Sequence, residues 1–311
     1  MPAVMSPPKK LQRQTRPPGG VFPNAEVQAT LLRLYDAKLA CWPVPYEEFD
    51  IRTHFGSTHI VAAGDRDAPP LLMLHQGSTP SFTWQPLIAP LAARYRTYAV
   101  DTIGDVGKSV LADPAQHPMN GEELASWLCQ VAALLGIERC DVVAGSYGSW
   151  LAVHYATFAP ARVRSLVLQV PMALPTWRQT AGVLARLMTM SVGSSPAKLE
   201  RSLSYMMGDA PVVRELFGDW FTALIPAKCK VRIPPPYPIS ISRLESIQMP
   251  TLVIMGGSDP LIGDAERAAR HALKHIRRVE VEIVSNGTHA LHAGQADLVT
   301  ARMLEFLDSV S

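Results

Sequence analysis

Residues 140–152 read CDVVAGSYGSWLA, and this stretch decides the fold. Its apolar run, residues 142–144, has the length and the β-branching of a buried parallel strand. After Gly148 the apolar positions follow a helical spacing, so that Ser146 stands between two glycines at a strand-to-helix junction. Such a sharp turn needs small neighbours, and it points a helix N-terminus at the serine hydroxyl. The alternative is an ordinary loop that uses glycines for its geometry.

Strand and helix patterns alternate on both sides of this stretch. This alternation predicts an α/β fold, in which a mostly parallel sheet carries helices on both faces. Strands are expected at residues 47–53, 58–63, 71–74, 97–100, 141–144, 165–169, 251–255 and 279–284. Helices are expected at residues 24–39, 84–94, 122–135, 147–158, 177–190, 197–207, 212–224, 264–275 and 296–310. Since the alternation stops between residues 171 and 249, we expect a core at 21–170 and 250–311 and a small helical lid, or cap, inserted at 171–249.

Composition narrows the class of protein. The 311 residues are 48% hydrophobic and 18% charged, which is enough apolar material for a large core. A formal net charge of +2 is too small to indicate binding to nucleic acid or to an anionic membrane. Residues 1–20 are basic and rich in proline, so we expect a disordered tail rather than a secretory signal. The four scattered cysteines favour a reducing, cytoplasmic location, and the oligomeric state stays open.

Three reactive residue types follow three of the expected core strands. Ser146 follows the strand at 141–144, Asp259 follows the strand at 251–255, and His289 follows the strand at 279–284. Because the carboxyl ends of parallel strands meet at one edge of a sheet, these side chains are expected to lie together. A histidine can take the proton of an attacking serine, and a carboxylate can orient that histidine. His292 is the alternative to His289 as the base.

A serine nucleophile also requires two N–H groups aimed at the oxygen on which negative charge develops. One donor is expected to be the amide of Tyr147, which directly follows the serine. The other is expected from the loop after the strand at 71–74, with Gly77 as the first choice and Ser78 as the second. His75 is expected to support this loop through hydrogen bonds.

With these features the chain resembles the α/β-hydrolase superfamily, specifically serine carboxylesterase-like members with a short helical cap. The resemblance covers roughly residues 46–307. It depends on His75-Gln76-Gly77, on the stretch from Asp101 to Ser109, on Ala144 to Gly148, on Gly256 to Asp259 and on Thr288-His289. The family pattern Asp-x-x-Gly-x-Gly-x-Ser is a structural turn, and the resemblance therefore implies that Asp101 and Ser109 belong to the scaffold.

The chain departs from the family pattern at two positions. Ala144 stands where the serine turn usually begins with glycine, and it is small enough to keep the strand close to the helix. Gln76 stands where the family usually has the glycine of a His-Gly pair. The Gln76 side chain could therefore enter the pocket or change how Gly77 presents its N–H group.

The resemblance implies a serine hydrolase that cleaves an apolar small-molecule ester through an acyl-enzyme and needs no metal or cofactor. The same three residues could instead serve carbon–carbon, lactone or thioester hydrolysis, or perhydrolysis. A hydrolase-fold binding protein with little turnover is the alternative of another class. The substrate pocket is expected to include Gln76, Ser78, Met172 and Trp177, although the apolar residues could equally be the core of the cap itself.

Overall fold

The structure is a computed structural model that describes residues 20–174 and 196–310. Within these ranges the chain builds one sheet of nine strands, in the order β1-β2-β4-β3-β6-β7-β8-β9, with β5 paired to β2. The strands are β1 (Tyr46–Thr53), β2 (Gly56–Ala63), β3 (Pro70–Leu74), β4 (Arg96–Val100), β5 (Val110–Leu111), β6 (Cys140–Gly145), β7 (Val163–Gln169), β8 (Thr251–Gly256) and β9 (Val279–Val284). The expectation of an α/β fold with a mostly parallel sheet is confirmed.

Pairing in the sheet separates an antiparallel edge from a parallel centre. β1 and β2 form a hairpin, and β2 pairs antiparallel with β4. From β4 through β3, β6, β7, β8 and β9 every pair is parallel. The strands β6 and β8 are buried along their whole length, as their nearly continuous apolar sequences predict. The carboxyl ends of the central strands therefore meet at one edge.

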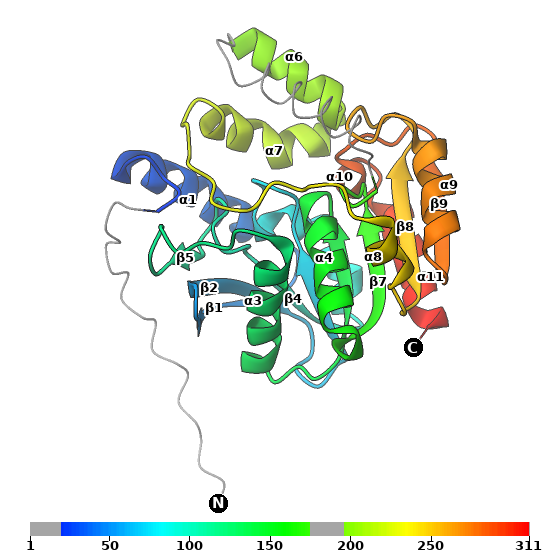
Figure 1. The fold of residues 1–311 in the computed structure, drawn as a ribbon. Coiled ribbons are helices and arrows are strands. Elements are labelled where there is room, and N and C mark those ends of the chain that lie inside the picture. The colour runs from blue at the N-terminus through cyan, green and yellow to red at the C-terminus, as the bar shows by residue number, and fades with distance from the viewer. Residues whose placement is uncertain (1–19, 175–195, 311) are drawn as a thin grey trace, which may run out of the picture.

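Helices cover both faces of this sheet, as Figure 1 shows. α3 (Gly121–Leu134) and α4 (Tyr147–Phe158) lie side by side on the face toward the viewer, and α11 (Ala296–Ser309) lies behind β8. α9 (Ala265–His275) packs beside β9. α1 (Ala25–Ala40) begins where expected, because the Asn24 side chain accepts the Val27 N–H group at 2.9 Å. No helix within the described ranges is long and apolar enough to cross a bilayer.

The helix expected at residues 84–94 is shorter than predicted. The chain there forms a 3₁₀ turn at Ser81–Trp84 and a single α-helical turn, α2 (Ile88–Ala92). Pro86 and Pro90 explain the difference, since a proline has no N–H group to donate and its ring crowds the preceding turn.

The segment inserted between β7 and β8 carries α6 (Pro196–Met207), α7 (Pro211–Leu224) and the short α8 (Ile241–Glu245). Figure 1 shows α6 and α7 together at the top of the molecule, above the edge where the central strands end. α7 contacts α1 on one side and α10 (Leu291–Gly294) on the other. The expected helix at 177–190 lies outside the described residues, as does the tail before residue 20.

Candidate active site

The turn between β6 and α4 holds Ser146 in a strained conformation. Its φ is +47° and its ψ is −112°, a combination that side chains with a Cβ rarely adopt. A Cβ added to Gly148 would lie 2.2 Å from the carbonyl oxygen of Leu74, so only glycine lets α4 approach β3 this closely. The expected strand–turn–helix around the serine is therefore present, and it places Ser146 at the carboxyl end of β6.

Ser146, His289 and Asp259 form one line of hydrogen bonds. The Oγ of Ser146 lies 2.9 Å from His289 Nε2, and His289 Nδ1 lies 2.8 Å from Asp259 Oδ2. All three side chains are buried, with exposed fractions of 6%, 5% and 1%. The second oxygen of Asp259 accepts the N–H group of Leu261 at 2.8 Å, which fixes the carboxylate. Such a line can pass a serine proton to an imidazole held in one orientation.

The loops that carry the acid and the histidine are pressed against each other. A Cβ added to Gly256, the last residue of β8, would lie 2.3 Å from the carbonyl oxygen of Gly287. The backbones approach this closely only because both residues are glycines. The N–H group of His289 also donates to Met206 of α6 at 3.2 Å. The histidine loop is therefore held by both the core and the inserted segment.

Gly77 lies beside the serine turn. A Cβ added to Gly77 would lie 3.4 Å from the Cβ of Tyr147, so the two expected N–H donors belong to neighbouring residues. His75 supports their loop as expected. Its Nε2 accepts the N–H group of Thr102 at 2.9 Å, which leaves the proton on Nδ1 to be donated to the Gln76 carbonyl at 2.6 Å.

Ser78 is the second choice for the N–H donor, but its N–H group already donates a hydrogen bond within the protein. It donates to Asp105 Oδ2 at 2.8 Å, and the backbone of Ser78 is left-handed with φ +62°. Trp220 of α7 donates its indole N–H group to the Ser78 carbonyl at 2.8 Å. Burial raises the pKa of Asp105, while the nearby His75 and the two backbone N–H donors of Ser78 and Val106 oppose that rise.

Asp105 belongs to a turn that is longer than the family pattern. Four residues separate Gly104 from Ser109 here, whereas the pattern Asp-x-x-Gly-x-Gly-x-Ser allows three. Asp101 nevertheless acts as scaffold, because its buried carboxylate accepts the hydroxyl and N–H groups of Ser81 at 2.7 and 2.9 Å. Sequence reasoning missed Asp105, and the extra residue in this turn was the signal that could have revealed it.

His292 does not contact Ser146 through a hydrogen bond. Its two ring nitrogens lie 2.9 Å from Gln76 Nε2 and 2.9 Å from Thr83 Oγ1. Among the two histidines considered for the base, the structure therefore brings only His289 to the serine. Gln76 itself is buried, with an exposed fraction of 5%.

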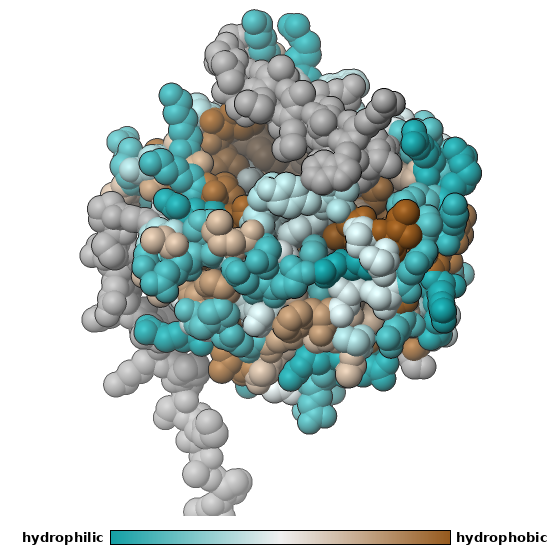
Figure 2. All heavy atoms as spheres, in the orientation of Figure 1, coloured by the Kyte–Doolittle hydropathy of each residue, from teal (hydrophilic) through white to brown (hydrophobic). Residues whose placement is uncertain are grey.

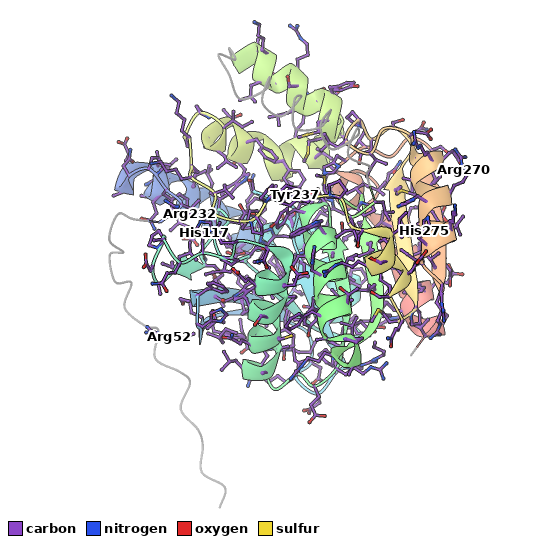
Figure 3. The ribbon with its side chains drawn as sticks, in the orientation of Figure 1. Arg52, His117, Arg232, Tyr237, Arg270 and His275 are labelled. Atoms are coloured by element: carbon purple, nitrogen blue, oxygen red, sulfur yellow. The ribbon has the colours of Figure 1, made fainter. Side chains whose placement is uncertain are left out.

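A proline-rich strap between α7 and α8 crosses the amino-terminal half of α4, the helix that begins at Tyr147. We call residues 225–240 the strap. The Tyr147 hydroxyl donates to the carbonyl of Pro234 at 2.9 Å, and the Trp150 indole donates to the carbonyl of Tyr237 at 2.7 Å. Figure 3 marks Tyr237 on this strap. Prolines suit this role, since they hold the backbone extended and leave its carbonyl groups free to accept.

A half-open cavity of about 950 Å³ lies between the inserted helices α6 and α7. Its lining includes Leu203 and Met207 of α6 and Phe217 and Phe221 of α7, and Figure 2 shows brown apolar atoms in a hollow at the top of the molecule. Neither Ser146 nor His289 lines this cavity, but Gly208 of its lining lies near the histidine loop, since an added Cβ there would lie 3.2 Å from Thr288, the neighbour of His289.

Met172, expected in the pocket, is buried, and its N–H group donates to the Ser146 carbonyl at 3.3 Å. Trp177 lies outside the described residues. Gln76 and Ser78 lie in the loop of Gly77, where their polar groups bond to protein partners, and neither lines the cavity between α6 and α7.

Comparisons with known proteins identify the family to which the chain is similar. The family model described as "Alpha/beta hydrolase family" matches residues 71–302. An uncharacterized carboxylesterase, nap, of Bacillus subtilis (strain 168) is 32% identical over 283 residues, which cover 88% of this chain and 91% of the relative. The carboxylesterase YbfK of the same strain is 31% identical over 293 residues, covering 92% and 96% of the two chains. The crystal structure of the naproxen esterase (carboxylesterase NP) from Bacillus subtilis superposes with a TM-score of 0.82 at 29% identity, over 91% of this chain and 99% of that one.

Proposed function

The chain belongs to the α/β-hydrolase family, and from this premise we propose that it is a carboxylesterase whose nucleophile is Ser146. One observation carries the proposal, namely the hydrogen-bonded line from Ser146 through His289 to Asp259. The two Bacillus carboxylesterases are about one third identical to this chain over nearly its whole length, and this similarity supports a carboxylic ester as the bond that is cleaved. A binding protein with little turnover would have no need to keep this line intact.

In the proposed reaction the Ser146 oxygen attacks the ester carbonyl while His289 Nε2 takes the hydroxyl proton. His289 then gives that proton to the departing alcohol, and an acyl-enzyme remains on the serine. In the second half a water attacks the acyl carbon while His289 takes its proton, and the bond between the acyl carbon and the Ser146 oxygen then breaks. His289 returns the proton to that oxygen and the carboxylic acid leaves. Asp259 keeps the proton of the imidazole on Nδ1, so that Nε2 faces the serine, and it stabilises the imidazolium that forms.

The N–H groups of Tyr147 and Gly77 are the proposed donors to the oxyanion. Tyr147 N is the first amide of α4, so the positive end of the helix dipole adds to its hydrogen bond. Gly77 lies beside it, while the neighbouring N–H group of Ser78 is already bonded to Asp105. Removing one such donor costs about 10²–10³ in kcat in other hydrolases.

An apolar ester is the substrate class that the cap helices favour. Apolar side chains make up half of the lining of the cavity between α6 and α7, beside five charged ones, and Gly208 of this lining neighbours Thr288 of the histidine loop. An apolar acyl or alcohol group would be desolvated there, at roughly 25 cal/mol for each Å² of buried surface. We therefore propose that the inserted helices act as the substrate-binding cap.

A panel of substrates tests which class of bond the protein cleaves. Purified protein is assayed with p-nitrophenyl esters of increasing acyl length, matched thioesters, lactones and vinylogous β-diketones. We expect kcat/KM to rise with acyl length until the cavity is filled, and esters to exceed the diketones by at least about 100-fold. Faster cleavage of the diketones, or an equal and slow rate with every substrate, would contradict a carboxylesterase. Perhydrolysis is checked by adding hydrogen peroxide and acetate, and it is expected to be minor.

A further inference from the structure

The side chain of Gln76 passes close to the residue before the proposed nucleophile. Its Cγ lies 3.0 Å from the position that a Cβ on Gly145 would occupy, so the side chain runs directly over the residue before the nucleophile. Its amide nitrogen ends 2.9 Å from Nδ1 of His292. A single side chain therefore spans from the loop of Gly77, past the serine turn, to the helical turn α10.

The surroundings of His292 keep its ring in a form that can accept a hydrogen bond from the Gln76 amide. It is 1% exposed, with Trp84 and Phe217 packed against its ring at centroid distances of 6.2 and 5.7 Å. Burial, with a further contribution from His289, lowers the pKa of His292 to about 3, so the ring stays neutral at ordinary pH. Since the Gln76 amide donates to Nδ1, the single ring proton lies on Nε2 and is donated to Thr83 Oγ1 at 2.9 Å.

The hydrogen bond between Gln76 and His292 joins the loop of the proposed oxyanion donor to the segment that follows the proposed base. Gln76 precedes the proposed oxyanion donor Gly77, and His292 follows the proposed base His289 by three residues. On the other side of Gly77, Ser78 is held by Asp105 and by Trp220. Gly77 itself has no side chain with which to fix its N–H direction. Its direction is set by the peptide that it shares with the Gln76 carbonyl, which accepts from His75 Nδ1 at 2.6 Å and from Thr79 Oγ1 at 3.0 Å, and by how the residues on either side anchor that peptide.

We propose that Gln76 and His292 are positioning residues that hold the Gly77 N–H group in register with the Ser146–His289 pair. This inference rests on the proposed carboxylesterase function. The α/β-hydrolase pattern has glycine at the position of Gln76, and a glycine could make no such link. Both partners are buried, so the loss of either leaves a polar group without its bond, and the loop shifts to recover one. Misplacement of a reacting group by about 1 Å can cost about 10²-fold in rate.

The test compares Gln76→Leu, His292→Leu and the double variant in ester hydrolysis. We expect Gln76→Leu to lower kcat by about 10- to 100-fold with KM within about twofold, because the oxyanion contact is made in the transition state. His292→Leu should give a similar loss, and the double variant should be little worse than either single one. His292→Asn, whose amide oxygen can still accept from Gln76, should retain kcat within about threefold.

Gln85→Leu is the matched control, since Gln85 is partly exposed and its side-chain amide donates to the Cys41 carbonyl at 2.7 Å. A rise in KM at constant kcat for Gln76→Leu would make Gln76 a substrate contact and overturn the proposal. Unchanged kinetics, or fully additive losses in the double variant, would also overturn it. Those outcomes leave carboxylesterase function intact as long as hydrolysis by the parent still depends on Ser146.

A second measurement does not depend on esterase activity. The ¹⁵N shifts of the His292 ring in the parent should show a neutral ring with an accepting Nδ1, and Gln76→Leu should move the Nδ1 resonance. No change in that resonance would show that the Gln76–His292 bond is absent in solution. If the parent hydrolyses no ester at all, the proposed function fails, and this readout still decides whether the pair exists.

Discussion

Ser146→Ala is expected to lower kcat for ester hydrolysis by about 10⁶-fold, to the level left by binding and the oxyanion donors alone. The loss should be this large because the hydroxyl is the atom that bonds to the acyl group, and nothing else at the turn can replace it. The fold should be unaffected, since the side chain of Ser146 bonds to His289 but its backbone makes the contacts that hold the turn. Steady-state rates with a p-nitrophenyl ester, beside circular dichroism and thermal unfolding, check both statements.

Ser258→Ala is the matched control for this substitution. Ser258 is an exposed serine directly before Asp259, and its hydroxyl lies at the long distance of 3.4 Å from the Ser285 carbonyl. We expect its kcat to stay within about twofold of the parent. A Ser146→Ala variant that keeps more than about 1% of the parental kcat would show that another group performs the attack.

His289→Ala is the second substitution with a large expected effect, again a fall of about 10⁶-fold in kcat. Without the imidazole, no group within hydrogen-bond distance of Ser146 Oγ among the described residues can accept its proton. KM should change little, because the ring acts on the serine and not on the bound substrate. Initial rates over a range of ester concentrations separate the two parameters.

Two other histidines make this test discriminating. His275, labelled in Figure 3, is the last residue of α9 and bonds to Glu245 of α8, so His275→Ala should leave kcat unchanged. His292→Leu should cost about 10- to 100-fold, as expected for a positioning residue, and thus far less than His289→Ala. Equal losses for His289→Ala and His292→Leu would mean that the assignment of the base from geometry is wrong.

Much of the fold could be predicted from the sequence because its signals are local. The strand β6 and the helix α4 follow from the change of apolar period across Ser146, and β9 begins and ends at the expected residues. The failure at residues 84–94 is also local. An apolar helical spacing suggested a helix, but Pro86 and Pro90 remove the N–H groups that such a helix needs.

The candidate site could be predicted in part for a different reason. Topology brings the ends of parallel strands to one edge, so Ser146, Asp259 and His289 could be placed together before any distance was known. The partner of Gln76 could not be predicted in this way. Gln76 and His292 are 216 residues apart in the chain, and whether a buried amide faces a ring nitrogen depends on side-chain packing that leaves no periodic pattern.

In the inserted segment, the helices could be predicted but their contacts with the core could not. Its helices α6 and α7 were expected within a residue or two of their bounds, yet their contacts with the core depend on single polar atoms. Trp220 donates to Ser78, and Thr288 donates to Met207, so the cap and the site share hydrogen bonds. Neither bond follows from hydropathy, because the hydropathy of Trp220 or Thr288 does not say which carbonyl group its polar atom will meet.

Labelling with a fluorophosphonate tests the central claim, a serine nucleophile that forms a covalent adduct, most directly. The serine oxygen displaces fluoride from phosphorus, and the adduct is located by intact-mass measurement and by peptide mapping. The account predicts one adduct per chain, placed on Ser146, with ester hydrolysis lost in proportion to labelling and with no adduct on the Ser146→Ala variant. Ester hydrolysis that survives full exposure to the reagent, or an adduct on any residue other than Ser146, would contradict it.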